Sequence, residues 1–168
     1  MRNIVILLCI SAAAVFGQTA QEEANKKLAI KFMDPKTSME ERFATMHNDY
    51  IQHNPMFKRF GEINGTHGKE EFSLLMKTMF RNGPPPDQAK KGGPQPPAGD
   101  PKHIVIAEGD LVMILQKRFE PDPMKPGKFY ETFWFDMWRV KDNKLYEHWD
   151  AATIPTPIPE FLKAPVKP

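Results

Sequence analysis

The sequence predicts an α+β domain in which helices come first and an antiparallel sheet follows. Two observations lead to this class: apolar residues recur at helical spacing in the first half of the chain, and extended apolar runs separated by turn residues fill the second half. The 168 residues are the length of one domain, and an apolar content of 40% with 12 Phe, 3 Trp and 3 Tyr can fill one core. A chain that is disordered throughout is therefore excluded.

Residues 1–20 are expected to be a signal peptide. Arg2 precedes a run of apolar and small residues that ends at Gly17 and is too short to span a bilayer. Cleavage is expected after Gly17, with Ala20 as the alternative. The only cysteine, Cys9, lies in this segment, so the mature chain holds no disulfide. We expect an exported protein, periplasmic or secreted, with no stable membrane insertion once the signal is removed.

Three helices are expected at the start of the mature domain, residues 21–154. The first ends at Asp34-Pro35, and its apolar face consists of Ala24, Leu28 and Phe32. The second begins at a capping box formed by Ser38 and Glu41. Residues 50–55 are then extended, and Gly61 and Asn64-Gly65 are turns. The third helix is expected to pack on the concave side of the sheet through Phe72, Leu75, Met76, Met79 and Phe80.

Residues 83–101 contain 7 Pro and 4 Gly in 19 positions, a composition that excludes a helix or a sheet ladder. We interpret this segment as an exposed loop insertion, with a polyproline recognition ligand as the alternative. Two hairpins follow. The first joins residues 104–108 to 111–119 through Gly109-Asp110, whose order suits a type II′ turn, and the second joins residues 129–140 to 145–154. Residues 155–168 form a Pro-rich C-terminal tail that is expected to dock only in part.

The turn of the second hairpin decides which side chains meet. A three-residue turn at 141–143 pairs Asp136 with His148 and puts Asn143 in the left-handed conformation. A two-residue turn pairs Asp136 with Trp149 and sends His148 to the opposite face of the sheet. We favour the three-residue turn because it places the polar and aromatic residues on one face, namely Trp134, Asp136, Trp138, Tyr146, His148 and Asp150.

Asp136, His148 and Asp150 are the residues that could carry chemistry, because each is polar in a strand otherwise suited to burial and therefore needs a partner. A purely structural interpretation is that Asp136 and His148 form a cross-strand pair that stabilises the sheet. A metal site made from His148, Asp150 and His53 has no strong ligand motif to support it, so no metal is expected.

Three motifs in order resemble the SnoaL-like polyketide cyclase family of the nuclear transport factor 2-like superfamily, over about residues 22–154. They are residues 50–55 (YIQHNP), 107–112 (AEGDLV) and 135–150 (FDMWRVKDNKLYEHWD). The resemblance implies a cone-shaped fold, in which a strongly curved antiparallel sheet wraps round three helices and encloses an apolar pocket. Cyclases of that family close rings by aldol condensation without metal or cofactor, using an Asp acid/base and a pocket His.

On this resemblance, Asp136, His148 and Asp150 match the ends of the family's Asp-to-His-Trp-Asp motif, and His53 matches its early His. Many relatives carry a further His where this chain has Leu115 or Gln116, so one acid/base group is missing. Asp136 or Asp150 would be the base, His148 would hold it, and His53 and Asn54 would donate hydrogen bonds to an enolate oxygen. The substrate is expected to lie against Tyr50, Asn54, Trp134, Trp138 and Tyr146.

The function expected from these residues is cofactor-independent acid/base chemistry next to the carbonyl of a small apolar molecule. The alternatives are a binding protein that uses the same pocket without catalysis, and an interaction protein whose Pro-rich loop binds a partner. Twenty-three basic and 21 acidic residues are scattered along the chain, so no nucleic-acid partner is expected. A homodimer is expected through Phe129, Phe133, Phe135 and Met137, which alternate onto the face away from the pocket. The alternative is that the curved sheet or the C-terminal tail covers them.

Overall fold

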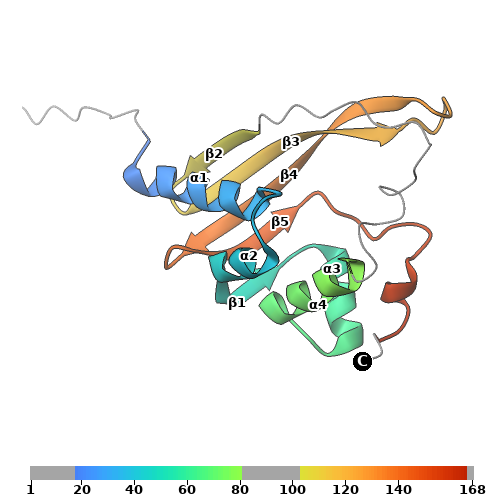
Figure 1. Cartoon of the computed structure of the whole chain (residues 1–168), viewed down its shortest axis with the longest axis horizontal. Coiled ribbons are helices and arrows are strands. Elements are labelled where there is room, and N and C mark those ends of the chain that lie inside the picture. Colours follow the sequence, from blue (N-terminus) through green and yellow to red (C-terminus); the bar gives the residue numbers. More distant parts are fainter. Residues whose placement is uncertain (1–17, 81–102, 166–168) are drawn as a thin grey trace, which may run out of the picture.

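The computed structural model describes residues 18–80 and 103–165. A five-stranded sheet in the order β1-β5-β4-β3-β2 carries the helices on one side, which confirms the predicted α+β class (Figure 1). The elements are α1 (Ala20–Met33), α2 (Met39–Thr45), β1 (Met46–Gln52), α3 (Pro55–Asn64), α4 (Gly68–Phe80), β2 (Ile104–Glu108), β3 (Leu111–Pro121), β4 (Phe129–Lys141), β5 (Lys144–Asp150) and η1 (Glu160–Leu162). The apolar run of the expected signal peptide and the Pro-rich loop 83–101 lie outside the described residues.

The sheet is mixed, so the prediction of a purely antiparallel sheet is wrong for one strand. β2 to β5 run antiparallel to their neighbours, but β1 pairs in parallel with β5, with Ile51 opposite Glu147 and Gln52 opposite His148. Helices α3 and α4 and the first hairpin separate β1 from β5 in the chain, and a connection of that length can bring the last strand back beside the first in the same direction. The end of β1 therefore lies beside His148.

A capping box starts each of the first two helices. Thr19 and Glu22 form the box of α1, and Ser38 and Glu41 form the box of α2. The buried face of α1 differs from the prediction by one position along the chain. It consists of Asn25, Ala29 and Phe32, whereas Ala24 is exposed and Leu28 is half-buried. The Asn25 amide donates to the carbonyl of Gly109 at 3.0 Å, and this bond ties α1 to the β2–β3 turn.

Helix α3 lies where turns were predicted. Asn54 caps it by accepting from the backbone N–H of Met56 at 2.8 Å, and Pro55 occupies the first helical position, where its missing N–H costs nothing. Phe57, Phe60 and Gly61 form its buried face at the spacing i, i+3, i+4. Gly61 is inside the helix because α4 approaches closely there, and a Cβ at this position would overlap the Glu71 carboxyl.

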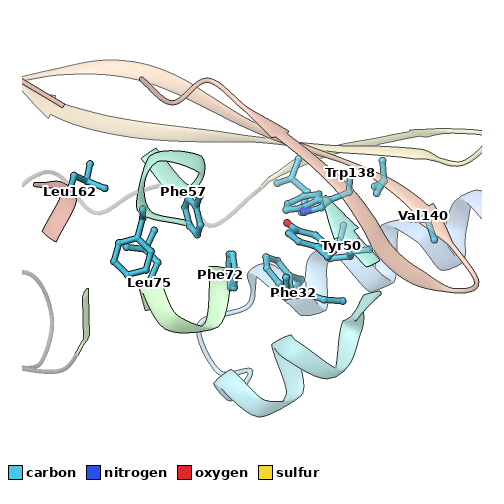
Figure 2. Close-up of a cluster of buried hydrophobic side chains, with 14 residues drawn as sticks. Phe32, Tyr50, Phe57, Phe72, Leu75, Trp138, Val140 and Leu162 are labelled. Carbon is cyan, nitrogen blue, oxygen red and sulfur yellow. The ribbon is translucent and has the colours of Figure 1, made fainter. Parts of the chain in front are cut away.

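Aromatic rings fill the space between the helices and the sheet (Figure 2). Phe72 of α4 stacks on Phe57 of α3 with ring centroids 5.2 Å apart, and Phe32 of α1 meets Trp138 of β4 edge-on at 5.6 Å. Leu75 has no exposed surface. Burying side chains of this size stabilises the fold by about 1.5–3 kcal/mol each. Trp138, which lies among these rings, has no exposed surface.

The C-terminal segment docks on α3. Phe161 of η1 packs edge-on against Phe60, with centroids 6.3 Å apart, and Leu162 is 1% exposed. Within residues 18–80 and 103–165, no helix has the length and apolar character needed to cross a membrane.

The opposite face of the sheet presents apolar side chains to solvent. We define the outer apolar face by its three most exposed members, Ile104, Ile106 and Phe133, which are 57%, 52% and 55% exposed. Phe129, Phe135 and Met137 point to the same face of β4 as Phe133, and they are half-buried. The tail segment that docks on α3 does so through Leu162 on the helical side of the sheet (Figure 1).

Candidate functional site

The β4–β5 hairpin turns through two residues, so the predicted three-residue turn is wrong. Asp142 and Asn143 both have positive φ, 51° and 56°, which is the type I′ geometry that matches the twist of paired strands. Lys141 pairs with Lys144 across this turn. Asn and Asp tolerate the left-handed conformation better than other non-glycine residues, which explains a turn of this kind without glycine.

A β-bulge then shifts the register by one residue. Val140 pairs with Leu145, but Arg139 pairs with Glu147, which leaves Tyr146 as the extra residue on β5. Beyond the bulge Trp138 lies opposite His148, and Asp136 lies opposite Asp150 rather than His148. The predicted pairing of Asp136 with His148 is therefore wrong.

The bulge nevertheless puts the three ionisable residues on one face. The turn is one residue shorter than predicted, which alone would move His148 and Asp150 to the opposite face. The bulge adds one residue to β5 and reverses this change. His148 and Asp150 therefore still point to the helical side, together with Asp136. His148 now lies diagonally across from Asp136, and its Nε2 is 3.2 Å from Asp136 Oδ1. The two residues are 5% and 7% exposed.

The His148 ring is held on three sides. Its face stacks on the Trp138 ring at 4.9 Å, and its Nδ1 is 3.1 Å from Gln52 Oε1 at the end of β1. The same Gln52 oxygen accepts the Asn54 backbone N–H at 3.0 Å, which identifies it as the acceptor atom. Nδ1 therefore donates to Gln52, and Nε2 is the nitrogen left to exchange a proton with Asp136.

Asp150 is fixed by two donors. Its Oδ2 accepts from the Asn54 side-chain amide at 2.8 Å, and its Oδ1 accepts from the Ala152 backbone N–H at 2.9 Å. Asn54 caps α3 at the same time, so the start of this helix is joined to the end of β5. Asp136 and Asp150 face one another across the strands, an arrangement of like charges that is unfavourable unless a proton or the imidazolium of His148 compensates it.

Two glutamines belong to this site and were not among the predicted residues. Gln52 holds His148, and Gln116 of β3 reaches Asp136 Oδ2 with its amide nitrogen at 3.4 Å. The period of two along β1 contains the signal for Gln52, because Tyr50 and Gln52 share one face while Ile51 and His53 share the other. The sequence pointed to Gln116 only because Leu115 or Gln116 stands where many relatives carry a His.

His53 and Tyr146 lie away from the site, so their predicted roles are wrong. His53 is on the outer side of the sheet, where its Nε2 is 2.8 Å from Glu147 Oε1 and its ring stacks on Trp149 at 5.2 Å. Tyr146, the bulged residue, packs edge-on against His47 at 5.3 Å. The strand period places His53 outward, and the bulge turns Tyr146 away.

The remaining predicted residues line the same side of the sheet as His148. Tyr50 is 3% exposed, and Figure 2 shows its hydroxyl turned toward the indole nitrogen of Trp138. Burial, the largest influence, raises the pKa of the Tyr50 hydroxyl well above its usual range. Trp134 lies two residues before Asp136 on β4. The guanidinium carbon of Arg118 lies over its ring, 4.4 Å from the ring centroid.

Asp136, His148 and Asp150 also form a group with the residue types of a metal site, because one ligand atom from each lies within 4.8 Å of the others. In the described structure these atoms are engaged with protein partners, since Asp150 accepts from two N–H groups and His148 Nε2 faces Asp136. The expectation that no metal binds here stays a prediction.

Two hollows of the described surface lie beside this site rather than in it. One of about 440 Å³ lies between β1, α3 and α4 and includes Gln52 in its wall, and one of about 740 Å³ lies between α2 and α4 beside Phe43 and Phe72. Neither is lined by Asp136, His148 or Asp150.

No protein-family model and no curated protein matches the chain. Solved structures with a similar course of the chain include a proposed SnoaL-like polyketide cyclase from Jannaschia sp. CCS1, with 12% identity, a TM-score of 0.49 and coverage of 80% of this chain and 90% of the other. A proposed polyketide cyclase from Pseudomonas putida KT2440 has 17% identity, a TM-score of 0.44 and coverage of 82% and 94%. An NTF2-like protein from Anabaena variabilis ATCC 29413 has 14% identity, a TM-score of 0.46 and coverage of 80% and 93%.

Identities at this level concern the fold, and they transfer no substrate or reaction to this chain.

Proposed function

We propose that the chain is an exported, cofactor-independent enzyme that moves a proton next to the carbonyl of a small apolar molecule. The observation that carries the proposal is the Asp136–His148 pair, joined at 3.2 Å with both side chains less than a tenth exposed. A buried ion pair is weak support for stability, because desolvating two charges offsets most of their attraction. Such a pair in a sheet face of aromatic residues is better explained by proton transfer.

In this proposal Asp136 is the base. A C–H bond beside the carbonyl breaks, the proton passes to an Asp136 oxygen, and the electron pair moves to the carbonyl oxygen as an enolate. The Asp136 oxygen then returns a proton to the same carbon, and the electron pair moves back from the enolate oxygen as the new C–H bond forms. His148 is held by Gln52 with its Nε2 beside Asp136, so it keeps this carboxyl in place. The Gln116 amide nitrogen is 3.4 Å from Asp136 Oδ2 and would donate to the enolate oxygen. Trp134, which is half-buried on the same face of β4, would supply apolar surface to the substrate.

The test is hydrogen–deuterium exchange at a carbon acid, measured by proton NMR in D2O with cyclohexanone and acetophenone as probes. We expect the wild type to exchange the protons beside the carbonyl faster than buffer does, and Asp136→Asn to lose this activity. Asp49→Asn, the same change at an exposed position of β1, is the matched control and keeps it. No exchange above buffer, or equal exchange by Asp136→Asn, would refute the proposal.

The alternative is a binding protein that catalyses nothing. It is favoured by the hydrogen bonds of the site, because His148 uses both ring nitrogens and Asp150 both oxygens within the chain. A group with all its partners satisfied resembles a structural support for a binding surface. The same assay separates the two functions, since a binding protein leaves the exchange rate of the probes at the buffer value in every variant.

A further inference from the structure

The hollow of about 440 Å³ between β1, α3 and α4 contains a second group of buried polar atoms, separate from Asp136 and His148. Glu71 of α4 is 5% exposed, yet its Oε1 has no hydrogen-bond partner in the described part of the chain. Gln52 Nε2 and Thr66 Oγ1, in the wall of the same hollow, are likewise enclosed without a partner among the described residues. Buried polar atoms are normally hydrogen-bonded, so three in one hollow indicate something that satisfies them.

Gly61 of α3 lets the Glu71 carboxyl lie close against the helix backbone. A Cβ at this position would overlap Oε2 of that carboxyl and also the backbone oxygen of Thr66. Alanine is the better helix former by about 1 kcal/mol, so a glycine in the middle of α3 is unfavourable locally. The glycine therefore allows both Glu71 and the Thr66 backbone to pack against α3. The volume of the hollow is within the range of small-molecule sites.

We propose that this hollow binds a small organic cation that carries an ammonium group and a nearby oxygen acceptor. The Glu71 carboxylate and the Thr66 hydroxyl accept from the ammonium, and the Gln52 amide nitrogen donates to the oxygen. A metal ion fits less well, because hard cations need six or more oxygen ligands and the Gln52 N–H donor would oppose one.

The charges around Glu71 agree with a cationic ligand. Burial, the largest influence, raises the pKa of the Glu71 carboxyl to about 7, while Lys58 on α3 lowers it and Glu62 on α3 raises it. Tyr50 of β1 and His67 of the α3–α4 loop are the other titratable groups that line the hollow. A bound cation stabilises the ionised Glu71 carboxylate, which burial destabilises. The cation therefore binds the ionised form in preference, and its affinity rises with the pH.

The experiment uses the 15N-labelled mature chain titrated with 3-amino-1-propanol, with 1,3-propanediol as the uncharged probe of the same shape. We expect the amine to shift the amide signals of residues 61–71 and of the Gln52 side chain. A carboxyl with a pKa of about 7 is about 3% ionised near pH 5.5 and about 90% near pH 8, so the amine should bind about 30-fold more tightly at the higher pH. The diol should shift none of these signals.

Glu71→Gln should bind the amine at least tenfold more weakly and lose the pH dependence, whereas Glu70→Gln, the same change at the exposed neighbouring position, should behave as wild type. If Glu71→Gln does not fold, the pH comparison on the wild type decides alone. The proposal is overturned if the amine causes no shifts, which means that water alone fills the hollow. It is also overturned if the diol binds equally, or if binding does not strengthen between the two pH values.

Discussion

Replacing Glu71 by Gln should make the protein more stable than the wild type above neutral pH. The carboxyl has a pKa of 4.5 in a solvated chain and about 7 in the fold, because burial penalises its charged form. Between these values the folded state binds a proton that the unfolded state has lost, so the Glu71 contribution to stability is complete below pH 4.5 and disappears as the pH rises through 7. Glutamine has the same shape and no charge to desolvate.

The magnitude follows from the two pKa values. Each pKa unit corresponds to about 1.4 kcal/mol, so the rise from 4.5 to about 7 corresponds to about 3 kcal/mol. This is a large part of the about 5–15 kcal/mol that stabilises a typical domain. The difference in unfolding free energy between Glu71→Gln and wild type should therefore be near zero at about pH 4 and reach about 3 kcal/mol at about pH 8.

Urea denaturation of both proteins at several pH values measures this difference, with Glu70→Gln as the control for a change at an exposed position. Taking the difference removes the contributions of all other titrating groups that the two proteins share. A difference that stays constant across the pH range, or that falls as the pH rises, would refute the claim that the fold buries an ionisable Glu71.

Three further predictions concern the core, the outer apolar face and the N-terminus. Leu75→Asp should abolish cooperative thermal unfolding followed by circular dichroism, because it buries an unpaired charge at a position with no exposed surface, whereas Ile30→Asp at a 44% exposed position should fold. Phe133→Lys should convert a homodimer to a monomer in light scattering, and a wild type that is monomeric at every concentration would refute an interface at the outer apolar face. Mass spectrometry of the exported chain should show Gln18 as the first residue, since removal of Thr19 by the later cleavage would cost α1 its cap, worth about 1 kcal/mol.

Local patterns predicted much of the fold because the features that start and end its elements are short-range. The capping box at Ser38, the Gly109-Asp110 turn and the apolar face of α4 from Phe72 to Met79 each depend on residues within a few positions of one another, and each lies where it was predicted. Helix α3 was missed because Gly61 was interpreted as a turn. A Cβ at Gly61 would overlap the Glu71 carboxyl, which lies on another helix, and the backbone oxygen of Thr66.

The site was predicted less well because it depends on a register and on a parallel strand. No local signal marked the bulge at Tyr146, and the bulge decides that Asp136 lies opposite Asp150. Gln52 reaches His148 only because β1 returns beside β5, a pairing between segments almost a hundred residues apart. The outward position of His53, in contrast, follows from the period of two along β1 and could have been predicted.

The coupling between Asp136 and His148 is the central claim, and 15N NMR of the His148 ring tests it most directly. Long-range proton–nitrogen spectra of the wild type should show Nδ1 carrying a hydrogen that it donates to Gln52, with Nε2 facing Asp136. In Asp136→Asn the Nε2 signal should move while the Nδ1 signal keeps its position. If Nδ1 carries no hydrogen in the wild type, or if Asp136→Asn leaves the Nε2 signal unmoved, the two residues do not share a proton and the account is contradicted.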